Sequence, residues 1–199
     1  QNYEGLICNM IEIIGSNGGE IFSNGKFMLT KPNVSESVQF MNDLIHKHNI
    51  APKDVANFTE NDSYKYALHN DIPFFRGWPT MQANVEVSKE DSIKLNNIVV
   101  ASLPHFKGKS PATVFGGWNM MISKDSNVKD EAKIFMKYIL TEEIQSLLYE
   151  DGGYLPVLSD MYHQTDTHKN LRYYLELMKS GQHRPSLQNY TQISNLISS

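Results

Sequence analysis

The sequence is poor in cysteine, in long apolar runs and in net charge, and each shortage excludes a class of protein. Cys8 is the single cysteine among 199 residues, so an internal disulfide scaffold is excluded. No apolar run approaches the roughly 18 residues that a membrane-spanning helix requires. The formal net charge of −4 gives no electrostatic reason to expect a nucleic-acid partner. An aromatic content of 11% is nevertheless too high for a disordered chain.

The sequence also lacks the short motifs that mark nucleotide-binding loops, nucleophile elbows and zinc peptidases. His46 and His48 are two positions apart on an expected helix, so they face different directions and do not chelate one metal ion. Cys8 falls on the apolar face of another expected helix, where it is better interpreted as a small core residue than as a nucleophile. We therefore expect no catalytic residue, no metal and no cofactor.

Apolar residues spaced three and four apart predict that helices dominate the chain. The expected helices cover 1–15, 33–46, 126–139, 141–152, 171–178 and 189–198, and a shorter one starts near Thr59 and Asp62. Asn33 and Glu36 have the spacing of a capping box at the start of the second helix. Gly152-Gly153 is expected to stop the helix that precedes it.

Short apolar runs predict strands at 72–75, 97–103 and 114–122. Ser23-Asn24-Gly25 predicts the turn of a small hairpin. The alternation of helices with short strands indicates an α/β or α+β fold.

Three large aromatic side chains stand beside glycines, where packing alone would not place them. They are Trp78 after Gly77, Trp118 after Gly116-Gly117, and Tyr154 after Gly152-Gly153. Glycine removes bulk beside each ring, so a ligand or another backbone can approach closely. Flat rings suit the apolar C–H faces of a sugar, and flanking polar side chains can meet its hydroxyl groups. The alternative is that Trp78 and Trp118 are ordinary core aromatics.

A set of short motifs extends over the whole chain in one order. They are Tyr3-Glu4-Gly5-Leu6, Ser16-Asn17-Gly18-Gly19, Phe75-Arg76-Gly77-Trp78-Pro79, Gly116-Gly117-Trp118-Asn119, Gly152-Gly153-Tyr154-Leu155-Pro156 and Arg184-Pro185. At these spacings the chain resembles the extracellular sugar-binding proteins of bacterial ABC importers, especially the trehalose- and maltose-binding branch. Each motif alone is weakly specific, whereas the set in register is specific. Such proteins are about twice as long, so the resemblance implies that the first half is missing before Gln1.

The resemblance implies an α/β fold of the periplasmic-binding-protein type II kind, with two lobes joined by hinge crossovers and the first lobe largely missing. Residues 1–113 would form the main part of the second lobe. Residues 114–156 would be a hinge strand followed by a segment that completes the first lobe. Residues 157–199 would return to the second lobe.

The resemblance also implies which residues contact the sugar. Trp78 corresponds to a stacking ring in an R-x-W-P motif, and Trp118 to a Gly-Gly-Trp ring that closes on the ligand. Arg184 and Tyr190 match an arginine and a tyrosine that reach the ligand, and Tyr3 and Glu4 match a segment near the cleft. The candidate ligand-binding residues are Tyr3, Glu4, Trp78, Gly117, Trp118, Tyr154, Arg184 and Tyr190.

The implied function is the binding of a di- or oligosaccharide for an ABC importer, without catalysis. Its partners would be the sugar and the permease subunits in the membrane, and nucleic acid is not expected. The location would be periplasmic or extracellular, with a lipid anchor in the full-length protein. Thr80 stands where close relatives often carry an aromatic residue, and Gly77 where asparagine is common, which leaves the identity of the sugar open.

Three alternative functions stay open at this point. One is a solute-binding protein for a polyamine, a metal chelate or an oligopeptide, although Arg76 and Arg184 beside the rings argue against a cationic ligand. Another is a carbohydrate-processing enzyme, which would need a pair of carboxylates at a fixed separation. The last is an interaction protein whose exposed rings form a protein interface.

Overall fold

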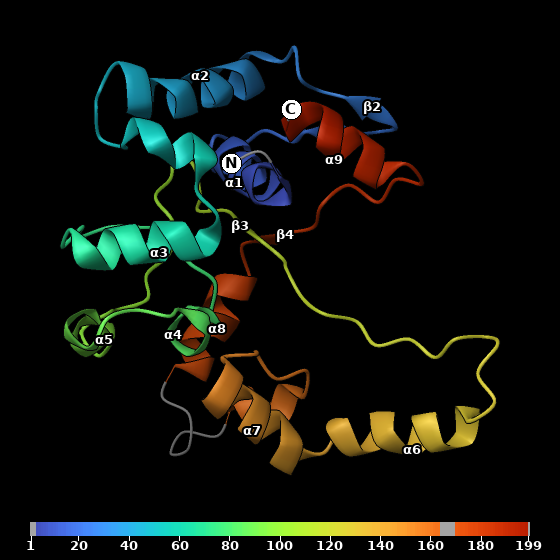
Figure 1. Ribbon diagram of the computed structural model, residues 1–199. Coiled ribbons are helices and arrows are strands. Elements are labelled where there is room, and N and C mark those ends of the chain that lie inside the picture. Colours follow the sequence, from blue (N-terminus) through green and yellow to red (C-terminus); the bar gives the residue numbers. More distant parts are fainter. Residues whose placement is uncertain (1–2, 164–169, 199) are drawn as a thin grey trace. The chain divides into compact units, whose positions relative to one another are not determined.

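The computed structural model describes residues 3–163 and 170–198 (Figure 1). The chain divides into two compact units. The first comprises Gln1–Arg76, Val87–Phe115 and Leu177–Ser199, and the second comprises Gly77–Glu86 and Gly116–Glu176. The chain therefore leaves or re-enters the first unit after Arg76, Glu86, Phe115 and Glu176.

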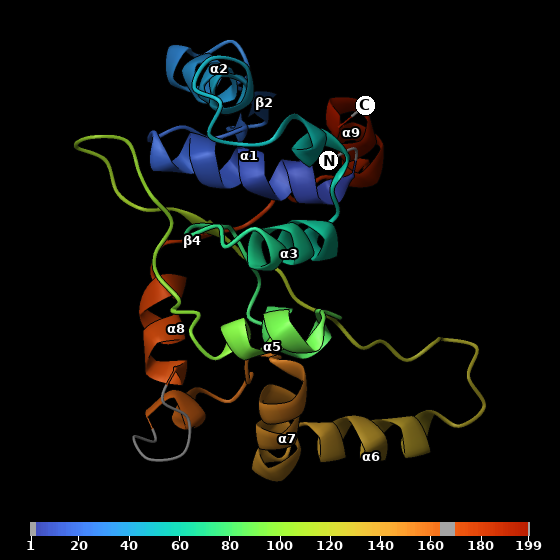
Figure 2. The same cartoon turned by 60° about the vertical axis from the view of Figure 1, so that its left-hand side comes forward.

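The first unit is built around α1 (Glu4–Ser16), which buries an apolar face. Its buried apolar side chains are Ile7, Cys8, Met10, Ile11 and Ile14. Helices α2 (Pro32–His46) and α9 (Tyr190–Ser198) pack against α1, as Figures 1 and 2 show. These helices confirm the predictions from apolar spacing. Leu196 of α9, in contrast, is exposed.

The predicted hairpin is confirmed as β1 (Phe22–Ser23) paired antiparallel with β2 (Lys26–Phe27). Asn24 and Gly25 at its turn have φ values of 51° and 76°, the left-handed conformations that a two-residue hairpin turn requires. The rings of Phe22 and Phe27 meet edge to face across the pair, 5.1 Å apart.

The start of α2 differs from the expected capping box. Pro32 is the first helical residue, and Asn33 and Glu36 bond outside the helix instead. The amide of Asn33 donates to the carbonyl oxygen of Gly18 at 3.0 Å, and Glu36 accepts from the amide of Asn17 at 2.9 Å. Proline already suits the first helical position, so these side chains are free to bind the turn after α1.

The rest of the first unit comprises short helices and one pair of strands. The helices are η1 (Lys53–Asn57), α3 (Glu60–His69) and α5 (Lys89–Leu95). Thr59 and Asp62 stand at the start of α3 as expected and bond reciprocally as a capping box. β3 (Thr113–Val114) pairs in parallel with β4 (Gly181–Gln182) beside α1.

The predicted strands at 72–75 and 97–103 are wrong, because the structure gives these residues no strand pairing. The strand predicted over 114–122 is reduced to its start, since only Val114 of that run lies in β3. An apolar run becomes a strand only where a neighbouring strand accepts its backbone hydrogen bonds. The sequence pattern does not report whether such a neighbour is present.

The second unit contains α4 (Met81–Asn84), α6 (Lys129–Ile139), α7 (Glu142–Gly152), η2 (Ser159–His163) and most of α8 (Leu171–Met178). Its buried apolar side chains include Met81, Val85, Met161, Tyr162 and Leu171. Gly153 ends α7 in the left-handed conformation, with φ of 67°. A Cβ atom there would lie 2.5 Å from the carbonyl oxygen of Pro79, so glycine is required both by conformation and by space.

Helix α6 has an amphipathic sequence, but its apolar side is not buried. None of its residues is buried, and Phe135 is 54% exposed. The amphipathic pattern is present in the sequence, but within the described residues its apolar side lacks a covering partner.

Candidate functional site

The candidate residues of the first unit gather around the carboxylate of Glu4 at the start of α1. Arg184 Nη1 donates to Glu4 Oε1 at 3.0 Å, and the hydroxyl of Tyr190 donates to the same oxygen. Ser194, which lies one turn further along α9, donates its hydroxyl to Glu4 Oε2. The structure therefore brings Glu4 together with Arg184 and Tyr190, which lie 180 and 186 positions later in the sequence, and adds Ser194 to them.

This arrangement changes the acid–base properties of its members. Burial raises the pKa of Glu4, but hydrogen bonds from Ser194, Tyr190 and Arg184 outweigh burial, so the pKa lies below its usual value. The hydrogen bond to Glu4 raises the pKa of Arg184. Burial, followed by the hydrogen bond to Glu4, raises the pKa of Tyr190. At neutral pH the cluster thus holds a carboxylate, a guanidinium and two hydroxyl groups, a set that can exchange hydrogen bonds with a polyhydroxylated ligand.

Tyr3 is bound to a different element from its neighbour Glu4. Its hydroxyl donates to Glu60 Oε2 and accepts from the backbone N–H of Glu60 at 3.1 Å, at the start of α3. Burial, together with Glu60, raises the pKa of Tyr3. The ring also covers Gly5, where a Cβ atom would lie 2.7 Å from Tyr3 Cζ. Tyr3 therefore links α1 to α3.

In the second unit, Trp78 and the Gly116-Gly117-Trp118 segment lie together. A Cβ atom on Gly116 would come within 2.9 Å of Trp78 Cζ3, so the indole ring covers the glycine backbone. The corresponding position on Gly117 meets nothing within 4 Å and faces open space. Trp118 is 87% exposed. Trp78 is thus packed on a backbone that only glycine permits, while Trp118 presents its ring to solvent.

Tyr154 lies in the turn after α7 and remains exposed. Its ring covers Gly152, since a Cβ atom there would lie 2.5 Å from Tyr154 Cδ2. The next glycine, Gly153, contacts Pro79, which directly follows Trp78 in the sequence. The turn after α7 and the Trp78 segment are therefore neighbours within the second unit.

Arg76, which stands near Trp78 in the sequence, forms an ion pair with Glu12. Its Nε and Nη2 atoms both donate to the carboxylate of Glu12, each at 3.1 Å. Arg184 is similarly paired with Glu4. Because each guanidinium has a carboxylate partner, the two arginines no longer argue against a cationic ligand.

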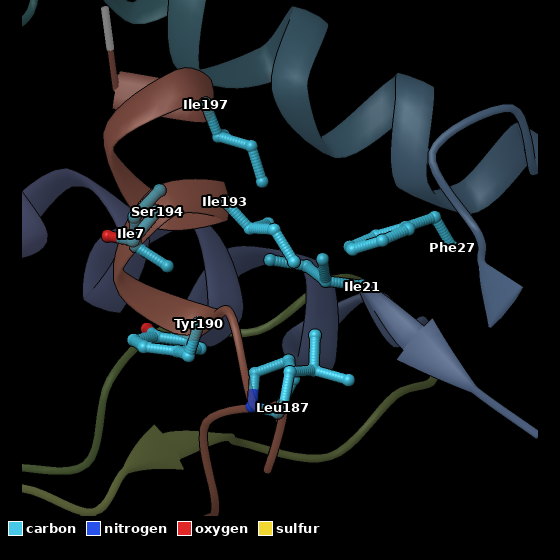
Figure 3. A pocket seen from close by; sticks show the side chains of 9 residues that line it. Ile7, Ile21, Phe27, Leu187, Tyr190, Ile193, Ser194 and Ile197 are labelled. Carbon is cyan, nitrogen blue, oxygen red and sulfur yellow. The ribbon is translucent and has the colours of Figure 1, made fainter. Parts of the chain in front are cut away.

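The cavities in the first unit are modest. One lies between α1, α9 and the hairpin and is lined by apolar side chains such as Ile7, Ile21 and Ile193 (Figure 3). Its volume of about 10 Å³ is that of a single water at most. A second, open hollow of about 260 Å³ is lined by residues that include Glu20, Gln182 and His183.

The part of the chain that the structure describes meets neither the requirements of a metal site nor those of a membrane-spanning helix. Residues 3–163 and 170–198 contain no group of three potential ligand side chains placed to hold a metal ion. No helix in these ranges combines the length and the apolar character needed to cross a membrane.

Residues 10–146 match the family model described as "Bacterial extracellular solute-binding protein". The chain belongs to this family. The matched range includes Trp78 and Trp118, and membership implies a periplasmic or extracellular location.

Individual relatives agree with this assignment of a solute-binding protein. A Deinococcus radiodurans protein named "Probable ABC transporter-binding protein" is 28% identical over the whole of this chain and 48% of its own length. The maltose-bound MalE3 of T. maritima is 30% identical and superposes with a TM-score of 0.88, over 99% of this chain and 51% of that protein. The chain thus spans about half the length of the relatives it matches.

Two more distant structures show the fold alone. The cyclic α-maltosyl-1,6-maltose binding protein of Arthrobacter globiformis matches with a TM-score of 0.63 at 21% identity, over 98% of this chain and 49% of its own. A solute-binding protein of Agrobacterium radiobacter K84, solved with ribitol, matches with a TM-score of 0.69 at 20% identity, over 96% and 49%. The predicted type II periplasmic-binding-protein fold is confirmed, with about half of it represented here.

Two residues of this solute-binding protein were not predicted from the sequence. They are Ser194, which binds Glu4, and Glu12, which binds Arg76. Glu12 was detectable in principle, because it is an acidic residue between Ile11 and Ile13 on a helix that is otherwise apolar there. Ser194 carries no such signal, since serine is ordinary on any helix surface.

The lowered pKa of Glu4 predicts an acid-dependent loss of stability in this solute-binding protein. A folded-state pKa below the ordinary 4.5 stabilises the fold above that pH, and the stabilisation is lost as the pH falls through the folded-state pKa. Glu4→Gln should therefore lower the free energy of unfolding at neutral pH and have little effect in acid below the folded-state pKa. Urea unfolding at several pH values measures the difference. Glu20→Gln, an exposed acidic position in the same unit, is the matched control. An equal effect of Glu4→Gln at every pH would contradict the prediction.

Proposed function

We propose that this chain is the C-terminal portion of a carbohydrate-binding protein that delivers a di- or oligosaccharide to an ABC importer. The observation that carries the proposal is the exposure of the Trp118 ring in the Gly116-Gly117-Trp118 segment. Trp118 keeps 87% of its surface exposed next to the open face of Gly117. A tryptophan ring held in water beside a bare backbone is suited to stack on the apolar face of a sugar ring.

The polar cluster of the first unit complements the rings. Sugars present apolar C–H faces and a periphery of hydroxyl groups, so a site needs both flat rings and charged or hydroxyl hydrogen-bonding groups. Trp78 and Trp118 would supply the rings, and Arg184, Glu4 and Tyr190 the polar groups. Tyr3 and Tyr154 would border the site. In the full-length protein, we assign Trp78 and the polar groups to the second lobe and Trp118 to the hinge segment.

Closure of the lobes on the ligand would be the working step. A sugar that contacts both lobes stabilises the closed state relative to the open one by the free energy of the contacts made only on closure. In this proposal, residues 1–113 and 157–199 belong to the second lobe, and 114–156 to a hinge strand with part of the first lobe. The closed form would dock on permease subunits in the membrane, and a lipid anchor would hold the protein near them. The protein binds and releases its ligand without a reaction.

The similarity to the maltose-bound MalE3 of T. maritima supports a sugar as the ligand, at 30% identity over 99% of this chain. Titration calorimetry of the full-length protein with maltose, trehalose, ribitol and spermidine tests the proposal. We expect saturable binding of at least one disaccharide and none of spermidine. Binding of spermidine alone would replace the sugar with a polyamine, and turnover of a chromogenic glycoside would establish an enzyme instead.

A further inference from the structure

Glu12 is a buried carboxylate in the middle of α1, only 5% exposed. It accepts hydrogen bonds from Arg76 Nε and Nη2, each at 3.1 Å, and from the backbone N–H of Val114 at 3.2 Å. A buried charge persists only when it is paired and its oxygens are satisfied. Here both oxygens are bound, one by Arg76 alone and the other by Arg76 and Val114.

The positions of these two partners in the chain are the informative point. Arg76 is the last residue of the first unit before the chain enters the second, and Val114 is the next-to-last residue before it enters again. Trp78 lies two residues after Arg76. Gly116, the first residue of the Gly116-Gly117-Trp118 segment, directly follows Phe115, where the chain leaves the first unit for the second time. One carboxylate thus holds the chain at the start of both aromatic segments.

The returning segment is fixed at the same place. The N–H of Phe115 donates to the carbonyl oxygen of Gln182 at 2.9 Å, and the N–H of Thr113 donates to that of Ser180 at 3.2 Å. β4 contacts α1, and the two elements can be followed in Figures 1 and 2. The side chain of Gln182 lies over Gly15 of that helix. The chain re-enters the first unit just before β4, after Glu176.

We propose that Glu12 is a positioning residue of the sugar site, which fixes through Arg76 and Val114 the places where the chain departs toward Trp78 and Trp118. The identity of the ligand rests on the proposed function. The role of Glu12 in fixing Arg76 and Val114 does not depend on that function. The bidentate pair constrains the direction of Arg76 as well as its distance, because the guanidinium fork fits a carboxylate in one plane. An apolar side chain at position 12 could fill the space but could not impose that direction or bind the Val114 N–H.

The test uses Glu12→Gln in the full-length protein, which keeps the shape of the side chain and removes its charge. Arg76→Lys is the second variant, because it keeps the charge but not the two-pronged geometry. Ile14→Ala is the matched control, since Ile14 is fully buried in the same helix and makes no hydrogen bond to either exit segment through its side chain. Incorporation of 5-fluorotryptophan gives ¹⁹F NMR signals for Trp78 and Trp118, assigned from the Trp78→Phe and Trp118→Phe proteins.

We expect both Glu12→Gln and Arg76→Lys to shift or broaden the fluorine signals of Trp78 and Trp118 without ligand, and to weaken disaccharide binding about tenfold. Ile14→Ala should lower the melting temperature yet leave both signals and the affinity close to those of the parent. Signals that coincide with the parent in both variants overturn the positioning role, as does an affinity loss no larger than that of Ile14→Ala. If the parent binds no sugar, the proposed function fails, and the fluorine signals alone decide whether Glu12 positions the rings. If Glu12→Gln does not fold, Arg76→Lys decides.

Discussion

Replacement of Trp78 by alanine is expected to weaken disaccharide binding by the full-length protein by roughly tenfold, which corresponds to about 1.4 kcal/mol. Two losses combine in this variant. The stacking surface disappears, and the backbone at Gly116, which the indole ring covers, becomes uncovered.

Calorimetry with the best-bound disaccharide measures the effect, with Trp118→Ala in parallel. Phe74→Ala is the matched control, because Phe74 is an aromatic residue four positions earlier that is 88% exposed but belongs to the first unit. We expect the control to bind like the parent. If Trp78→Ala and Trp118→Ala both retain the parent affinity, the assignment of the rings to the sugar site is wrong.

The 199-residue chain, studied alone, is expected to self-associate through the apolar side chains of α6 and α7. The exposed side chains are Ile134, Phe135 and Tyr138 of α6, Leu147 of α7, and Leu140 between the two helices. Burial of one large apolar side chain contributes roughly 1.5–3 kcal/mol, so several on adjacent helices are sufficient to drive association. The expected result is an average mass that rises with concentration in sedimentation equilibrium.

The double variant Phe135→Ser with Leu147→Ser should reduce this association strongly. A matched double variant, Ile93→Ser with Val99→Ser, removes two exposed apolar side chains from the first unit and should leave the association unchanged. A parent chain that stays monomeric at all concentrations and melts in one sharp transition would contradict the prediction.

Local signals in the sequence were sufficient for most helices and for the hairpin. The apolar spacing in α1 and the residues Asn24-Gly25 act through contacts within a few positions, so the pattern contains the information needed. The strands expected at 72–75 and 97–103 failed for the opposite reason. Whether an extended run is paired depends on a distant partner, and Val114 finds one in Gln182 whereas those runs do not within the described residues.

The candidate site shows the same division. The sequence named Trp78 and Trp118 through their adjacent glycines, because a glycine beside a ring is a local feature. It named Glu4, Arg184 and Tyr190 only through resemblance, and the structure shows that these residues share one hydrogen-bonded cluster. The pairing of Arg76 with Glu12 is likewise visible only in the structure.

The sequence by itself determined that this is a folded chain rich in helices, without a disulfide scaffold, with glycine-flanked aromatic rings in the order typical of a solute-binding family. Shortage of cysteine, of apolar runs and of net charge was enough to exclude the other classes, since those properties need no structure to be read. Only the tertiary structure decided which charged residues form ion pairs with one another and which aromatic rings remain exposed to solvent. Partners such as Glu12 and Arg76 are 64 positions apart, and their pairing follows from the packing of whole elements rather than from any local pattern.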